Sequence, residues 1–195
     1  MRTAGNYSFT TRLISWWDIP STPPPPPPPH LMPLVAVVGS RDTSFQTIQR
    51  AMAFYDVVEK KSVHVRQEVP GHIANRLQAA LFREIFAMLA KGTATVADIE
   101  TAMEYGPGMR WGIMGPSLLL HLGGGPGGAE PYARKFLGHL MSWYAAEDPD
   151  MDDGLVGTWE KETTAIVEES SREELGRNWD DHLVGILNRK GEVGK

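Results

Sequence analysis

The first sustained apolar run in the chain is short and strand-like. Residues 34–38 read Leu-Val-Ala-Val-Val and are followed by Gly39. A run of this length, rich in β-branched residues and ended by glycine, is typical of a buried parallel strand. A second, briefer extended piece is expected at residues 63–65, ahead of Pro70-Gly71. We therefore predict one residual strand near residue 36, without a sheet of its own.

Helical spacing of apolar residues takes over from about residue 43. Thr43 or Ser44 can cap the first helix, and Thr95 followed by Asp98 predicts a capping box on a later one. Gly-Pro-Gly at 106–108 is expected to break the chain. Further helices are expected at about residues 73–91, 117–122, 130–146, 157–169 and 173–190. The globular part is thus predicted to be all-α, a helical bundle.

The chain before this region has a different character. Residues 1–22 show no convincing periodicity, and Pro23 to Pro29 form an unbroken proline run. Such a run forms neither a helix nor a central strand, so residues 1–29 are expected to be a disordered extension with a polyproline II segment. Two uses stay open for that segment: a spacer, or a ligand for the aromatic groove of an SH3, WW or profilin-like partner.

Composition narrows the classes of function. The net charge of -5 and the pI of about 5.7 argue against binding to nucleic acid or to anionic membranes. The absence of cysteine excludes disulfides, thiolate metal sites and a cysteine nucleophile, and it fits a cytoplasmic protein. The apolar run at 117–122 is far too short to span a bilayer. The six histidines are scattered, so no metal site is expected.

Several segments resemble one known enzyme family. Residues 69–78, Val-Pro-Gly-His-Ile-Ala-Asn-Arg-Leu-Gln, are similar to the PGFxxNRL motif of the 3-hydroxyacyl-CoA dehydrogenase family. Residues 106–116, Gly-Pro-Gly-Met-Arg-Trp-Gly-Ile-Met-Gly-Pro, are similar to the GPGxRWxxxGP segment of its lambda-crystallin, L-gulonate 3-dehydrogenase and carnitine dehydrogenase-like branch. Residues 30–38 resemble the end of the family's nucleotide-binding domain, and residues 177–183 resemble the branch's RxxWRDxxL ending. The resemblance covers most of the chain.

The resemblance implies a two-domain NAD-dependent oxidoreductase of the kind used in fatty acid metabolism. In the family an N-terminal Rossmann domain binds NAD. A helical domain, of the 6-phosphogluconate dehydrogenase C-terminal-domain-like fold, supplies the dimer contact and part of the substrate cleft. A histidine acts as acid and base, a glutamate orients it, and an asparagine hydrogen-bonds the site. Removal of a hydroxyl proton as hydride departs needs a base with a pKa near neutrality, which imidazole provides.

Only one of these three family positions keeps its residue. The histidine position is Pro24, the glutamate position is Ala36, and the asparagine is retained as Asn75. Asn75 is therefore a substrate-binding candidate, although capping or bridging helices is the alternative. Arg110 is the second candidate, because a guanidinium can bind a carboxylate through two hydrogen bonds. A structural role for Arg110 beside Trp111 is equally open.

Other candidate sites find less support. Nothing before Val35 supplies the strand, GxGxxG turn and helix of a Rossmann site, so no cofactor is predicted to bind this chain. His30 lies near the lost histidine in sequence but matches a different family position. The glycine-rich residues 123–128 are expected to be an interhelical loop. Residues 148–154 lack calcium-loop spacing and are expected to be a solvated acidic loop.

These observations predict three segments: an extension at 1–29, a strand and linking helix from the nucleotide-binding domain at 30–66, and a helical domain at 67–190. We expect a truncated relative of an NAD-dependent 3-hydroxyacyl-CoA or L-3-hydroxy acid dehydrogenase. It would retain the dimerisation and substrate-side domain, pair with itself or an intact paralogue, and be inactive alone. The alternative is a non-enzymatic interaction protein that uses its proline tract or helical surface.

Overall fold

The computed structural model describes residues 11–12, 31–167 and 172–193. The chain divides into two compact units, Met1–Ala80 and Leu81–Lys195. Within the described ranges helices dominate, which confirms the predicted, mostly helical fold class. Pro24, His30 and the proline run lie outside the described residues, and so does the predicted site for an SH3, WW or profilin-like partner.

The first unit contains a small sheet built around the predicted strand. Its elements are β1 (Thr11–Arg12), β2 (Leu34–Val38), α1 (Phe45–Val57) and β3 (Lys61–Val65). The strand order is β1-β2-β3, with β1 antiparallel and β3 parallel to β2. The expectation of a strand without a sheet was therefore wrong. The extended piece expected at 63–65 is part of β3, but its pairing with β2 was not predicted, because parallel pairing joins segments distant in sequence and Ser62 and His64 interrupt the apolar pattern.

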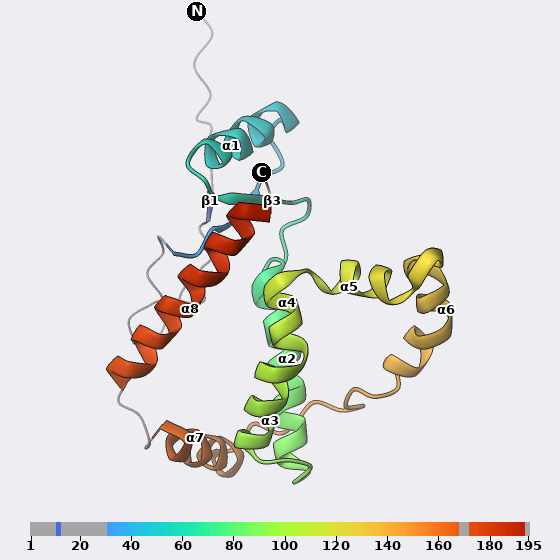
Figure 1. Ribbon diagram of the computed structural model, residues 1–195, viewed down its shortest axis with the longest axis vertical. Coiled ribbons are helices and arrows are strands. Elements are labelled where there is room, and N and C mark those ends of the chain that lie inside the picture. Colours follow the sequence, from blue (N-terminus) through green and yellow to red (C-terminus); the bar gives the residue numbers. More distant parts are fainter. Residues whose placement is uncertain (1–10, 13–30, 168–171, 194–195) are drawn as a thin grey trace, which may run out of the picture. The chain divides into compact units, whose positions relative to one another are not determined.

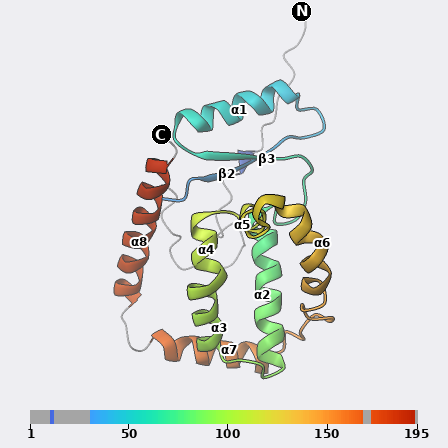
Figure 2. The same ribbon diagram turned by 45° about the vertical axis from the view of Figure 1, so that its right-hand side comes forward.

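The core of this unit lies between β2 and α1. Val35 and Val37 are almost fully buried and pack with Ile48 of α1. Figures 1 and 2 both show α1 lying along the sheet. The helix begins as predicted at Ser44, whose side chain accepts a hydrogen bond from the Thr47 amide at 3.2 Å. Alternation along β2 directs its other residues, including Ala36, to the opposite face of the sheet.

The remaining elements are helical. They are α2 (Ala74–Ala90), α3 (Val96–Met103), η1 (Glu104–Gly108), α4 (Met109–Ile113), α5 (Pro116–Gly123), η2 (Gly125–Gly127), α6 (Ala129–Leu140), α7 (Asp153–Val167) and α8 (Arg172–Val193). Gly92, at φ 60°, follows α2, as expected for a helix end. The capping box of Thr95 and Asp98 is confirmed at the start of α3. The expected break at 106–108 is a kink inside a π-helical turn, where Gly106 leaves helical geometry.

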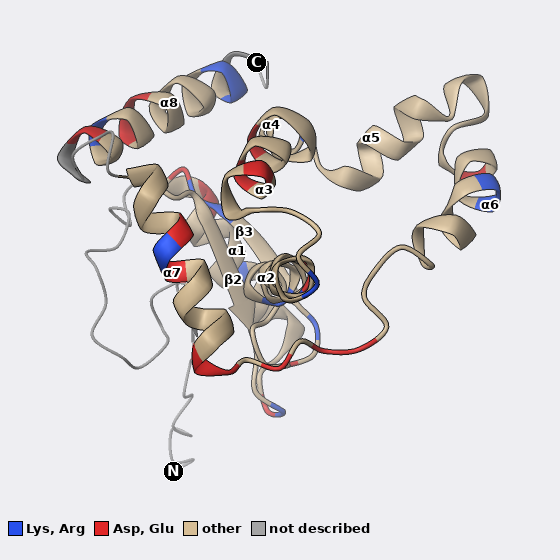
Figure 3. Cartoon of the chain, turned by 90° about the horizontal axis from the view of Figure 1, so that it is seen from below, with Lys and Arg blue, Asp and Glu red and all other residues tan. Residues whose placement is uncertain are grey.

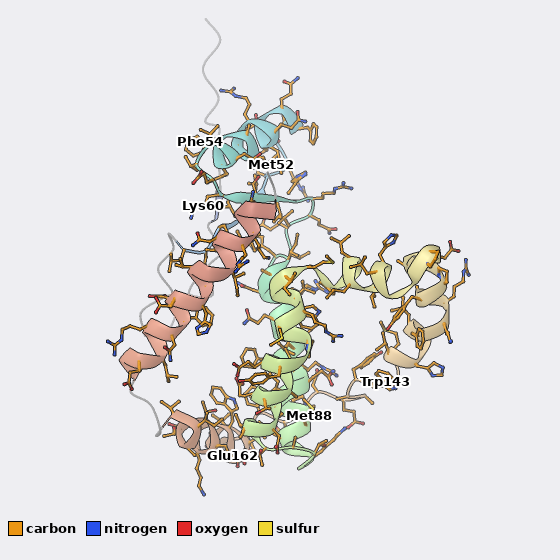
Figure 4. All side chains as sticks on the ribbon, viewed as in Figure 1. Met52, Phe54, Lys60, Met88, Trp143 and Glu162 are labelled. Carbon is orange, nitrogen blue, oxygen red and sulfur yellow. The ribbon has the colours of Figure 1, made fainter. Side chains whose placement is uncertain are left out.

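In the second unit, α7 packs against α2 and α3. The rings of Phe86 and Trp159 lie 5.6 Å apart between their centroids. Glu162 of α7 accepts a hydrogen bond from the Val96 amide of α3 at 2.7 Å, and Figure 4 labels Glu162 beside that helix. Since the first amides of a helix lack partners within it, this carboxylate stabilises α3 from outside. Val96 itself is buried.

Helix α6 ends at Leu140, earlier than the predicted residue 146. The following segment is held by two neighbouring residues of α2. Glu84 accepts a hydrogen bond from the Ala145 amide at 2.9 Å, and Arg83 donates to the Ala145 carbonyl oxygen at 3.0 Å. Arg83 also forms an ion pair with Asp148. This clamp fixes the backbone of Ala145 in a non-helical path, and the acidic segment beyond it leads to α7 (Figure 3).

Candidate functional site

Ala36, which the sequence resemblance predicts to stand at the family's glutamate position, lies in the middle of β2. Only 4% of its surface is exposed, and it packs in a small cluster with Val38 and Val65. A methyl group there can neither accept a hydrogen bond from an imidazole nor stabilise its charge. The first unit therefore has an apolar contact at this predicted position.

Asn75 is placed by a tight turn that precedes α2. The His72 amide donates to the Val69 carbonyl oxygen at 3.0 Å, with Pro70 and Gly71 between them. Gly71 has φ 72°, as the third position of a type II turn requires, and an added Cβ would lie 3.1 Å from the Arg76 amide nitrogen. The Pro-Gly pair of the motif thus sets the direction of the helix. Asn75 lies half-buried in its first turn.

His72 is a residue that the sequence analysis did not single out. It adopts φ 49°, which is uncommon for a residue other than glycine. Its Nε2 atom is buried and has no hydrogen-bond partner among the described residues. The sequence alone could have identified this position, because His72 stands where the motif PGFxxNRL has phenylalanine. Strain and an unpaired polar atom beside Asn75 make His72 a third candidate position.

Arg110 lies on α4 in the second unit, whereas Asn75 lies in the first unit. The Arg110 side chain is exposed, and the structure shows no hydrogen bond or ion pair for it within the described ranges. Its backbone carbonyl oxygen accepts from the Met114 amide at 3.0 Å, which ends the helix. The guanidinium is therefore open to an anionic ligand.

The turn between β2 and α1 does not fit a dinucleotide pyrophosphate. Such a site needs free amides and glycines that let the phosphates approach. Here the Ser40 amide donates to Thr43 Oγ1 at 3.0 Å, and the Thr43 amide donates to the Ser40 carbonyl oxygen at 3.1 Å. A Cβ on Gly39 would lie 2.8 Å from Ile48 Cδ1, so this glycine serves helix packing. No cofactor role follows for the turn.

The other candidates have structural roles in the second unit. Asp148 hydrogen-bonds Arg83 and thereby raises the pKa of that guanidinium, while Asp152 caps α7 by accepting from the Leu155 amide at 2.7 Å. The glycine-rich segment joins α5 to α6, and the Ala129 amide donates there to His121 Nδ1 at 3.2 Å. Across the described ranges no group of three or more metal-ligating side chains comes together.

Two family models match the chain in succession. The NAD binding domain of 3-hydroxyacyl-CoA dehydrogenase matches residues 25–69, and the C-terminal domain of the same enzyme matches residues 71–157. The junction between the two matches, at residue 70, lies in the turn that precedes α2. The chain belongs to the 3-hydroxyacyl-CoA dehydrogenase family, which uses NAD, and the resemblance of the sequence motifs is confirmed.

Curated proteins that are similar to this chain include L-carnitine dehydrogenases from several bacteria. The chain is similar to an L-carnitine dehydrogenase of Streptomyces coelicolor, with 39% identity over 85% of this chain and 52% of the relative. It is also similar to an L-carnitine dehydrogenase of a Pseudomonas species, with 37% identity over 83% of this chain and 51% of the relative. For an L-carnitine dehydrogenase of Bacillus cereus the identity is 35%, over 81% of this chain and 49% of the relative. The chain spans about half the length of these relatives.

One solved structure shows the same fold. It is the crystal structure of 5-formyl-3-hydroxy-2-methylpyridine 4-carboxylic acid 5-dehydrogenase, an NAD+ dependent dismutase. The TM-score is 0.62 at 21% identity, over 84% of this chain and 52% of that one.

In the described part of this chain, no helix is both long and apolar enough to cross a membrane.

Proposed function

We propose that this chain supplies the substrate-side helical part, residues 67–190, of a 3-hydroxyacyl-CoA or L-3-hydroxy acid dehydrogenase, and that the 195-residue chain alone does not transfer hydride. The observation that carries the proposal is Ala36, a buried methyl group at the family's glutamate position. Pro24 stands at the histidine position. With neither group present, no side chain at these positions can remove the proton of a substrate hydroxyl.

Each unit offers one candidate residue for the substrate-side role: Asn75 in the first unit and Arg110 in the second. An amide can hydrogen-bond a hydroxyl or carbonyl oxygen, and an exposed guanidinium can bind a carboxylate. The relatives are named for L-carnitine, which carries both a hydroxyl and a carboxylate. We propose a small hydroxy acid as the ligand class for the second unit, with Arg110 bound to its carboxylate.

Binding by Arg110 can be measured separately from catalysis. Titration of the labelled chain with L-carnitine, followed by NMR, should shift the Arg110 signals, and Arg110→Ala should weaken binding roughly tenfold. Arg134→Ala is the matched control, because Arg134 is an exposed arginine already paired with Glu130 at 2.7 Å. Equal losses in both variants would contradict the assignment.

Activity tests the other half of the proposal. The chain is incubated with NAD and with L-carnitine, gulonate or 3-hydroxybutyryl-CoA, and NADH is followed by absorbance. The expected result is no NADH above the protein-free reaction. Clear turnover that His30→Ala abolishes would contradict the proposal, since it would identify His30 as a substitute base.

We also propose that the chain associates through its helical surface, with a second copy or with an intact paralogue. The support is a group of large apolar side chains on α5, α6 and the segment after α6 that stay exposed: Leu118, Leu122, Phe136, Met141, Trp143 and Tyr144. Trp143, labelled in Figure 4, is 72% exposed. Large apolar side chains that stay exposed on neighbouring helices, as on α5 and α6, are typical of an interface.

A further inference from the structure

The edge of β2 that faces away from β3 is covered by a segment that neither family model matches. Thr11–Arg12 pairs antiparallel with β2, with Thr11 opposite Val37 and Arg12 opposite Ala36. The family models begin at residue 25, so β1 lies outside the matched regions, whereas β2 lies inside them. Its role is therefore open.

The register shows which backbone groups of β2 meet β1. The Lys61 amide of β3 donates to the Pro33 carbonyl oxygen at 2.7 Å. Because backbone groups alternate along a strand, Pro33, Val35 and Val37 direct theirs toward β3, and Ala36 directs its amide and carbonyl toward β1. Arg12 and Ala36 are thus the pair whose backbone groups point at each other, and the Thr11 amide points away from β2.

An open edge on β2 would be hazardous. Four consecutive residues of the strand, Val35 to Val38, are at most 9% exposed, and none of them is charged. A regular, uncharged strand edge with unpaired amides is a template for pairing with another chain. Leaving the Ala36 amide and carbonyl buried without partners would also destabilise the sheet.

We propose that Thr11–Arg12 is an intramolecular edge cap, which pairs with Ala36 and keeps β2 from pairing with a strand of a second copy. The cap acts through its backbone. Two residues suffice, because only one residue in the middle of β2 directs its amide toward that edge.

Amide hydrogen exchange of the full chain, read residue by residue, tests the cap. Proline at position 12 removes the amide that faces Ala36, whereas proline at position 11 removes an amide that faces away. Arg12→Pro should speed exchange at Ala36 roughly tenfold. Thr11→Pro should leave Ala36 protected, and exchange at Val35 and Val37, which face β3, should stay slow in all three chains.

Two results would overturn the proposal. The first is an Ala36 amide that is unprotected in the unaltered chain, or equally protected in the chain and both variants. The second is protection of Ala36 that rises with protein concentration in the unaltered chain, since this would assign the edge to a second copy.

Discussion

His72 combines a left-handed backbone with a buried Nε2 atom that has no partner in the described part of the chain. An unsatisfied buried polar atom destabilises a fold by about 1–3 kcal/mol. His72→Phe, which introduces the family's residue, should therefore raise the free energy of unfolding by about 1 kcal/mol in urea titrations. His72→Gln keeps a polar group and should bring no gain. A loss of stability in His72→Phe would show that the imidazole has a partner.

Asp98 gives the fold a dependence on pH. Its hydrogen bonds with the Thr95 side chain and backbone lower the pKa of the carboxyl below its ordinary value of 3.8. The folded chain then binds this proton less tightly than the unfolded chain, so the contribution is present above pH 3.8 and is lost as pH falls through the lowered pKa. NMR titration should show this pKa returning toward 3.8 in Thr95→Ala. A wild-type midpoint at or above 3.8 would refute the assignment.

At the scale of elements, the sequence predicted the start of a helix correctly where the capping side chain lies in the first turn or directly before it. Ser44 and the Thr95–Asp98 box start their helices as predicted. Contacts distant in sequence were not predictable from such signals. The pairing of β2 with β3 needs a register across the intervening helix, and α6 ends early because α2 clamps Ala145.

The same contrast holds for the candidate site. The Pro-Gly turn and Asn75 follow from the motif and from the need for a positive φ at Gly71. The burial of His72 Nε2 does not follow from the motif, because it depends on which atoms surround the ring. The sequence showed a histidine in place of phenylalanine, but not whether that histidine is satisfied.

The clamp between α2 and the segment after α6 is testable in two of its members. Glu84 is 31% exposed and accepts from the amide of Ala145, which is 9% exposed. Glu84→Ala leaves that amide unpaired and should lower the free energy of unfolding by about 1–2 kcal/mol. Asp148→Ala should cost under about 0.5 kcal/mol, because Asp148 is 83% exposed and water screens its ion pair. The reverse order would contradict this description of the clamp.

At the scale of the whole molecule, the exposed apolar residues of α5 and α6 predict association. Light scattering at micromolar concentration should show a dimer or a larger species. Leu122→Lys places a charge among these residues at a position that is 62% exposed, so it should shift the chain toward monomer without unfolding it. If the unaltered chain is monomeric at this concentration, the proposed association is ruled out.

The most direct test of the account is the affinity of the 195-residue chain for NAD, because hydride transfer requires the dinucleotide. The β2–α1 turn uses its amides locally, and we propose that Ala36 and Pro24 stand at the positions of the family's proton-transfer pair. Calorimetric titration of the chain with NAD should therefore give only the heat of dilution. Saturable binding of one NAD per chain, lost in His30→Ala, would contradict the claim that no hydride-transfer site is assembled here.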